Sequence, residues 1–399
     1  MDVDGFDLER LPPGFLADPY PTYRALREQS PVKRMPDGSL FLTRHADLSR
    51  IYRDAATFSS AKADEFRPKF GDTPLYRHHT TSLVFNDPPL HTRVRRLIAG
   101  ALTPRAIAGM EPGLVLAVDA LLDRMGGHAD LIEDYASAIP IEVIGNLLGV
   151  PPAERGPLRG WSLAILGALE PVVTPDAAAR GNQAVTDFLD YLEVLIADRR
   201  ARPGDPGQDV LTRLMQADPS GDRLTREELL HNCIFLLNAG HETTTNLIGN
   251  ALVLLADYPE QRARLLAEPA LARSAVEEVL RYESSNQLGN RAAVAPFEID
   301  GDAYPAGTRI TLCIGAANRD PAAFPNPDAF DIARAPNRHL AFAAGIHACI
   351  GMSLARMEGA VALTRFLRRF PRYAPSAPPV QGMRARFRGY ACVPCALDG

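Results

Sequence analysis

The residue best placed to do chemistry is Cys349, which lies in a glycine-punctuated loop directly before a helical pattern. The loop reads Phe342-Ala-Ala-Gly345-Ile-His347-Ala-Cys349-Ile-Gly351, and MSLARMEGAVALTRFLRRF follows it. A thiolate in this position is stabilised by the dipole at the helix N-terminus and by backbone N–H groups that point at sulfur. An isolated cysteine is usually a small buried hydrophobic residue. The Phe, Gly and His residues at fixed offsets favour a functional thiolate instead.

A second polar group lies in the middle of a long apolar stretch, LTREELLHNCIFLLNAGHETTTNLIGNALVLLADYP. Thr225 and Glu228 form a capping box, and the apolar pattern reaches Tyr258 before Pro259 stops it. The pattern predicts a helix of about 33 residues, roughly 50 Å long at 1.5 Å per residue. Because residues 238–246 include Asn, His, Glu and Thr side chains, a membrane span is excluded. We expect a buried helix with a polar centre.

Two more pairs have helical spacing. Glu278 and Arg281 are three residues apart, and His91 and Arg95 are four apart, so each pair can share one helix face. Taken alone, neither pair is specific, because the first is a common surface ion pair and the second is more often solvated surface.

Two metal motifs can be weighed directly. His241-Glu242 is not followed by histidine at position 245, which excludes a zinc protease motif. Cys392-Val-Pro-Cys395 could be a redox pair or half of a zinc site. No second Cys-x-x-Cys exists and the pair lies in a strand-like tail, so a structural reading is favoured there.

The elements that must position these residues are mainly helical. Residues 90–266 have a helical pattern, whereas residues 293–314 have strand-like segments separated by Gly and Pro turns. Residues 11–40 predict a loop, a short helix and a hairpin around Pro36-Asp37-Gly38. Residues 59–90 are predicted to be irregular, as a functional loop. The fold class is therefore mainly α, helix-rich, with small peripheral β-sheets.

Composition limits the function classes. The chain has 399 residues, of which 46% are hydrophobic and 23% charged, with a net charge of −5 and five cysteines. Disorder, a disulfide framework and a nucleic-acid-binding protein are excluded. The N-terminus MDVDGFDLER lacks an apolar run, so we expect no signal peptide or membrane anchor, and a cytoplasmic location. Length alone suggests two or three domains.

In their order along the chain, these motifs resemble the cytochrome P-450 family of haem-thiolate monooxygenases, of the soluble bacterial type. DPYPTYRALREQSPV near the start and AANRDPAAFPNPDAFD before the cysteine loop fall in family order too. The resemblance covers nearly the whole chain and implies a cytochrome P-450 fold, with residues 1–399 as a single domain around one haem. The cofactor it implies is heme b, iron protoporphyrin IX, with Cys349 as the iron ligand.

The resemblance also assigns the polar centre of the long helix. Ala239-Gly240-His241-Glu242-Thr243 matches the oxygen-binding segment, where the small Ala239 and Gly240 would leave room for dioxygen and substrate. Thr243 would hydrogen-bond the oxygen ligand while Glu242 relays protons. The structural alternative for Thr243 is a hydrogen bond to the carbonyl four residues earlier.

Further roles follow from the resemblance alone. The haem propionates would be held by His91, Arg95, Arg291 and His347, and the loop under the haem would be framed by Phe342, Gly345 and Gly351. Glu278 and Arg281 match the buried pair that fixes the fold behind the haem. Many members have an arginine as its third partner where this chain has Ala329, so His339 or Arg334 could substitute. Ala343 replaces a usual glycine and could tighten the loop.

The reaction implied is monooxygenation, with one oxygen atom entering an organic substrate and the other forming water. The chain is expected to lack an electron-donor domain, so electrons would come from a separate ferredoxin and ferredoxin reductase, docking at arginines such as Arg96, Arg105 and Arg356. The alternatives are a peroxygenase that uses hydrogen peroxide, and a non-catalytic haem sensor or carrier. The first would not need Glu242 and Thr243, and the second has no use for a proton relay.

The substrate is not identified by the sequence. By family position, its pocket would include Phe235, Asn238, Gln287 and Leu288. This mixture of apolar and amide side chains suggests a mid-sized, partly polar organic molecule.

Overall fold

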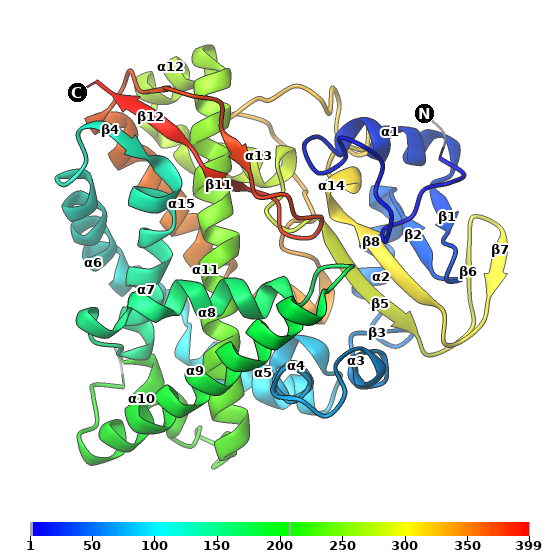
Figure 1. Cartoon of the computed structure of the whole chain (residues 1–399), viewed down its shortest axis with the longest axis horizontal. Helices are drawn as coiled ribbons and strands as arrows, with labels where there is room; N and C mark the ends of the chain where they lie inside the picture. Colours follow the sequence, from blue (N-terminus) through cyan, green and yellow to red (C-terminus); the bar gives the residue numbers. More distant parts are fainter. Residues whose placement is uncertain (1–2, 207–208, 399) are drawn as a thin grey trace. The chain divides into compact units, whose positions relative to one another are not determined.

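The computed structural model describes residues 3–206 and 209–398 and is mainly helical (Figure 1). Its contacts divide the chain into two compact units. Unit 1 contains Met1–Ser59, Val118–Ala136 and Thr243–Gly399, and unit 2 contains Ser60–Ala117 and Ser137–Glu242. The predicted fold class, helix-rich with small separate sheets, is confirmed.

The largest sheet of unit 1 has five strands in the order β1-β2-β8-β5-β3. These strands are β1 (Val32–Arg34), β2 (Leu40–Leu42), β3 (Phe58–Ser59), β5 (Leu288–Ala293) and β8 (Arg309–Cys313). Strands β1 and β2 form the predicted hairpin, in which the Met35 N–H donates to the Ser39 carbonyl at 2.8 Å and Gly38 has φ +80°. Strand β2 runs parallel to β8, so this sheet joins an N-terminal hairpin to a strand that lies far along the chain.

The core of unit 1 lies on the two faces of this sheet, because side chains alternate between faces along each strand. One buried cluster contains Leu40, Leu42, Ile310 and Leu312 and packs against α2 (His45–Arg53) through Leu48 and Ile51. The other face packs Phe41, Leu288 and Cys313 against α1 (Tyr20–Gln29) through Tyr23 and Leu26.

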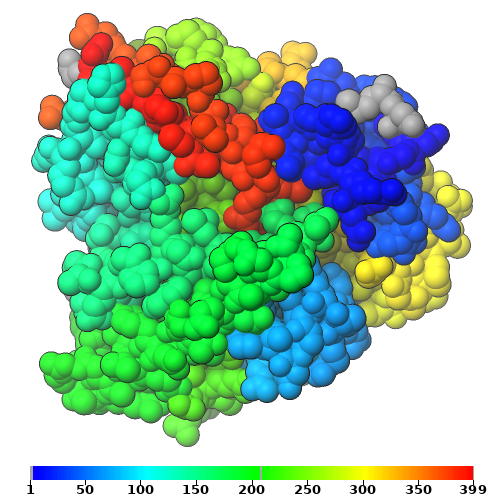
Figure 2. All heavy atoms as spheres, viewed as in Figure 1, coloured from blue at the N-terminus to red at the C-terminus, as the bar shows by residue number. Residues whose placement is uncertain are grey.

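The described part of unit 1 contains three smaller sheets. The predicted turn at Gly301 joins β6 (Phe297–Ile299) to β7 (Asp302–Tyr304). Near the C-terminus, β12 (Pro394–Leu397) pairs with β4 (Gly127–Asp130) and β9 (Ala374–Pro375), and β10 (Val380–Gln381) pairs with β11 (Tyr390–Cys392). Figure 2 shows this C-terminal segment, coloured red, exposed on one face of the molecule. The strand-like character predicted for the tail is confirmed.

The helices of unit 1 that matter for the site are α13 (Ala272–Tyr282), η5 (Gly345–His347) and α15 (Met352–Arg369). Its remaining helical segments are α12 (Pro259–Ala267), η4 (Pro269–Leu271), α14 (Ile314–Ala317) and η2 (Leu131–Ala136). Helix α13 packs against α15, which brings two segments from opposite sides of the cysteine loop together.

Unit 2 is built of helices, and its longest is α9 (Pro175–Ala201). Helix α9 packs along α8 (Gly156–Gly167), where Trp161 stacks on Phe188 at 5.0 Å between ring centroids. The other helical segments are α3 (Ala63–Phe70), α4 (Pro74–Thr81), η1 (Leu83–Phe85), α5 (Leu90–Ala101), α6 (Pro104–Leu122), α7 (Ala138–Leu148), η3 (Pro152–Glu154) and α10 (Val210–Met215). Helix α6 extends into unit 1.

The prediction that residues 59–90 are irregular is wrong, because α3 and α4 lie within them. Gly71, with φ +65°, ends α3. The Thr73 hydroxyl then caps α4 by accepting the Tyr76 N–H at 3.4 Å, and Pro74 occupies the first turn, where no N–H is needed. Among the prolines that indicated a loop, Pro74 starts a helix and Pro68 lies inside one.

The long helix α11 (Arg226–Asp257) has 32 residues and begins at the predicted capping box. The Thr225 N–H donates to the Glu228 carboxylate at 2.9 Å, and the Glu228 N–H donates to the Thr225 hydroxyl at 3.2 Å. Residues up to Glu242 belong to unit 2 and residues from Thr243 onward to unit 1. Among the described residues, no helix is long and apolar enough to cross a membrane.

A cluster of buried rings joins α3, α4, η1 and α11 within unit 2. The His78 ring lies 5.1 Å from His79 and 5.7 Å from His231. Burial, with neighbouring positive charge from Lys69 and Arg77, lowers the pKa of His79 to about 3 and that of His231 to about 4. The remaining rings of the cluster are Phe66, Phe70 and Phe85. These histidines are neutral at physiological pH.

Acid should therefore destabilise the protein through this cluster. The folded-state pKa values of His79 and His231 lie below the ordinary 6.5. The contribution of these neutral histidines to the free energy of unfolding is therefore fully present above pH 6.5 and is lost as the pH falls toward 4. Each such histidine adds a slope of up to about 1.4 kcal/mol per pH unit. The His79→Phe variant should show a flatter dependence in urea unfolding between pH 7 and 4.5. Exposed His128→Gln is the control, and equal slopes for all three proteins would contradict the expectation.

Candidate active site

The Cys349 loop of unit 1 presents the thiol at the surface. The Cys349 N–H donates to the Phe342 carbonyl at 2.9 Å, which closes the loop, and the Cys349 residue is exposed. Gly345 has φ +71°, and a Cβ there would lie 2.2 Å from the Tyr52 carbonyl oxygen, so only glycine fits. Helix α15 begins three residues after Cys349 with Gly351 as its N-cap. The sulfur therefore lies by a helix N-terminus, where a thiolate is favoured.

Ala343 shows why glycine is common at its position. Its φ is +55°, a left-handed conformation that costs an L-residue about 1–2 kcal/mol. Ala343 is partly buried against the core cluster of the five-stranded sheet, which holds it in place. Alanine at position 343 therefore keeps the left-handed backbone that glycine would adopt, at the cost of local strain.

A charged network that sequence reasoning missed lies beside this loop. Arg356 of α15 makes a bidentate pair with Glu277 of α13, at 2.6 and 2.9 Å, and its guanidinium lies 4.7 Å from the centre of the Phe342 ring. His339 contacts the same carboxylate at 3.1 Å. Burial opposes ionisation of Glu277, but the hydrogen bonds to His339 and Arg356 outweigh it and lower its pKa to about 2. The sequence suggests Arg356 for partner docking and His339 as a partner of the Glu278–Arg281 pair, and no local signal predicts that both contact Glu277.

The Glu278–Arg281 pair lies at the centre of a buried network on α13. Both side chains have 0% exposure and form two hydrogen bonds of 2.8 Å. Arg334 is the third partner, because its Nε donates to both Glu278 oxygens at 3.1 Å. Of the two substitutes suggested for Ala329, Arg334 fills the role, whereas His339 contacts Glu277. The Ala329 carbonyl instead accepts a hydrogen bond from Arg281 at 3.0 Å.

Removal of Arg334 should be costly. The Arg334→Ala variant leaves part of the charge on the buried Glu278 carboxylate uncompensated, and we expect a loss of about 2–4 kcal/mol. Arg264→Ala removes a half-exposed pair with Asp331 and should cost less than about 1 kcal/mol. Urea unfolding of both variants measures the difference, and equal losses would show that Arg334 is not needed to hold the carboxylate.

Three other predicted residues lie on or near β5 of unit 1. Arg291 is 9% exposed, lies over the Tyr52 ring at 5.1 Å and donates to the Asn290 carbonyl. Gln287 is buried and donates to the Ser284 carbonyl at 2.7 Å. Leu288 is 1% exposed within the core. Both of the last two residues contribute to packing in unit 1, and their contact with substrate stays a prediction.

In unit 2, His91 and Arg95 lie on α5 with the predicted spacing of one helical turn. The His91 side chain is buried and its backbone N–H donates to the Asp87 carbonyl at 3.0 Å, while Arg95 is half-buried. A histidine and an arginine thus lie one turn apart on the same helix face, and both side chains can donate hydrogen bonds to a carboxylate.

The segment predicted to bind oxygen includes part of an accessible stripe of α11. Ala239 is exposed and Phe235 and Thr243, each four residues away, are half-buried, although most of this helix is buried. Neither amide atom of the buried Asn238 has a hydrogen-bond partner among the described residues. Glu242 is buried, and a Cβ at Gly240 would lie 2.3 Å from the Ile144 side chain. Gly240 is therefore packed closely against Ile144, and the small residue on the open face of the helix is Ala239.

His241, within the same segment, is 1% exposed. Burial and the charge of Arg159 lower its pKa to about 3, so the His241 ring is neutral at physiological pH. Glu242 and Thr243 stay the residues predicted to relay protons.

Two of the three arginines suggested for docking are already paired. Arg96 forms ion pairs with Asp218 and Asp222 in unit 2, and Arg356 pairs with Glu277 in unit 1. Arg105 is exposed on α6.

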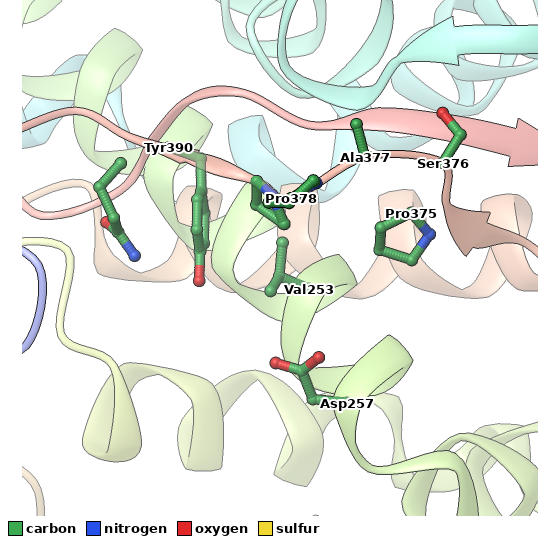
Figure 3. Close-up of a pocket in the computed structure, with 9 residues that line it drawn as sticks. Val253, Asp257, Pro375, Ser376, Ala377, Pro378 and Tyr390 are labelled. Atoms are coloured by element: carbon green, nitrogen blue, oxygen red, sulfur yellow. The ribbon is translucent and has the colours of Figure 1, made fainter.

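A separate pocket of about 500 Å³ lies in unit 1 between the end of α11 and the segment before β10 (Figure 3). Asp257 and Tyr390 face it together with three prolines, but its lining contains no histidine or cysteine. Cys392 and Cys395 are free thiols, and the described residues contain no cluster of three or more His, Cys, Asp or Glu side chains that could hold a metal ion. The Cys349 loop is thus the candidate site.

Comparison with known proteins agrees with this geometry. The family described as Cytochrome P450 matches residues 169–379. The cytochrome P450 monooxygenase PikC of Streptomyces venezuelae is 39% identical over 94% of this chain and 89% of its own. The biotin biosynthesis cytochrome P450 of Bacillus subtilis is 36% identical over 90% of each chain. A solved structure of P450BioI with an acyl carrier protein ligated to hexadec-9Z-enoic acid has a TM-score of 0.91 and 34% identity, covering 96% of this chain and all of that one.

The chain belongs to the cytochrome P450 family, and it is an oxidoreductase of the monooxygenase type. Its residues fit the haem of that family. Cys349 is exposed and lies in a loop that the protein already forms. On α11, the residues Phe235, Ala239 and Thr243 form a stripe that is accessible along one face of the helix. Arg291 carries a positive charge and His91 can donate an N–H, and side chains of these two types bind propionates.

Proposed function

We propose that this protein is a haem-dependent monooxygenase that inserts one oxygen atom from O2 into a small or mid-sized organic substrate. Electrons come from a separate ferredoxin and ferredoxin reductase, in the cytoplasm. The observation that carries the proposal is the exposed Cys349 thiol, held by a glycine loop at the start of α15. The cofactor is heme b, and residues 1–399 act as one domain around it.

The proposed haem contacts use the chain's own charges. Cys349 binds the iron, and Phe342, Gly345 and Gly351 keep the loop beneath it. His91, Arg95, Arg291 and His347 bind the two propionates through charged or neutral N–H donors. When bound, the haem supplies the dioxygen activation chemistry that thiolate ligation favours.

Proton delivery is assigned to Glu242 and Thr243. Thr243 is half-buried on the accessible stripe, where its hydroxyl would donate a hydrogen bond to dioxygen, and the adjacent Glu242 carboxyl would hold a proton and pass it on. This pair favours the monooxygenase over a peroxygenase, which needs no relay, and over a haem sensor or carrier.

The substrate is proposed to have an apolar body and one polar group. Phe235 supplies an apolar contact, and the buried Asn238 amide offers both a donor and an acceptor. A buried amide without a partner costs stability, which a hydroxyl or carbonyl of the substrate would recover.

Thiolate ligation is tested by the carbon monoxide complex of the reduced protein. The wild type should show a strongly red-shifted Soret band, because an anionic sulfur donates electron density to iron. Cys349→Ser should lose this band while Cys392→Ser keeps it. A wild-type spectrum without the shift would overturn the proposal.

The relay is tested with Thr243→Ala. We expect the yield of product per electron consumed to fall at least about tenfold, while reduction and the shifted Soret band persist. Thr186→Ala is the control, since the Thr186 hydroxyl bonds the Asn182 carbonyl on the exposed face of α9. Product formation from hydrogen peroxide alone, unaffected by Thr243→Ala, would favour the peroxygenase, and no product under any condition would favour the sensor or carrier.

A further inference from the structure

We infer that Arg356, held in place by Glu277, is a positioning residue that sets the reduction potential of the iron bound by Cys349. This inference rests on the proposed function, because it concerns the iron that Cys349 would bind. It assigns to the Glu277–Arg356 pair an electrostatic role that is distinct from the structural role of Glu278 and Arg281.

The geometry connects Arg356 to the sulfur ligand. Arg356 lies seven residues after Cys349, on the first turns of α15. Its guanidinium lies over the Phe342 ring at 4.7 Å, and the Phe342 carbonyl accepts the Cys349 N–H at 2.9 Å. The positive charge is thus stacked on the residue that closes the cysteine loop.

The guanidinium is also fixed. Both of its hydrogen bonds reach one carboxylate, at 2.6 and 2.9 Å, a bidentate geometry that limits rotation. His339 contacts the same carboxylate and lies 5.8 Å from the Phe342 ring. Glu277 is only 24% exposed, so the pair is partly shielded from solvent screening.

The interaction between the two charges is reciprocal. The hydrogen bond to Glu277 and the charge of Cys349 both raise the pKa of Arg356. A positive charge near the sulfur favours its anionic form. A cation near the ligand favours the reduced, more negative centre, whereas an anion favours the oxidised one.

The two members of the pair therefore have opposite electrostatic effects. Removing the guanidinium in Arg356→Gln should lower the potential, because it also leaves the Glu277 carboxylate unbalanced. Removing the carboxylate in Glu277→Gln should raise the potential, because the guanidinium is no longer neutralised. A purely structural pair would give shifts of the same sign for both variants, because either change breaks the same contact.

The test is a spectroelectrochemical titration of the full-length, haem-loaded protein without substrate. We expect each single variant to change the equilibrium constant for reduction about three- to tenfold, in opposite directions, where tenfold is about 59 mV for one electron. The double variant Glu277→Gln/Arg356→Gln and the charge-conserving Arg356→Lys should stay near the wild-type potential. Arg365→Gln, which breaks the pair with Asp119 farther along α15, is the matched control and should leave the potential unchanged.

Shifts of equal sign, or no shift, with the red-shifted carbon monoxide band intact would overturn this inference alone. A wild-type protein without that band would overturn the proposed function as well. If Arg356→Gln does not retain haem, Glu277→Gln must raise the potential while Glu277→Asp leaves it near wild type, and any other result overturns the inference.

Discussion

The fully buried carboxylate of Glu278 is the constraint on which much of unit 1 depends. An ion with 0% exposure must be matched by donors from the protein. Here these are the Arg281 and Arg334 guanidinium groups, the Asn337 amide and the Asp331 backbone N–H. Arg281 also donates to backbone carbonyls between Asn318 and Ala329. Satisfying one carboxylate therefore fixes α13 and the segment of about twenty residues that leads into the cysteine loop.

Two adjacent glutamates on α13 bind different partners. Glu278 faces inward and organises backbone, whereas Glu277 is partly exposed and holds Arg356 of α15. Neighbouring positions on a helix point about 100° apart, so one turn can serve two environments. The packing of α13 against α15 thus fixes both the scaffold and the charge beside Cys349.

Local signals explain what the sequence could predict. The capping box at Thr225, the hairpin turn at Gly38 and the loop before α15 each depend on residues a few positions apart. Arg334 and Arg356 lie 56 and 79 positions from their glutamates, so no local spacing predicts either pairing. The family resemblance offers Arg334 as one of two possible partners of Glu278, whereas no signal in the sequence pairs Arg356 with Glu277. The prediction for residues 59–90 was wrong for another reason. Proline is common both in loops and in the first turn of a helix, and only the Thr73 cap of α4 distinguishes the two cases.

The backbone of the cysteine loop shows why strain is tolerated at this site. Ala343 and Gly345 both have positive φ, so the chain turns sharply twice before it reaches Cys349. Those turns bring the Phe342 carbonyl to the Cys349 N–H, and the Phe342 ring under Arg356. An extended loop would remove the strain at Ala343, but it would also separate the thiol from the guanidinium. The strain is stabilised by packing of Ala343 against the sheet core, so the fold supplies the energy that keeps the ligand and the charge together.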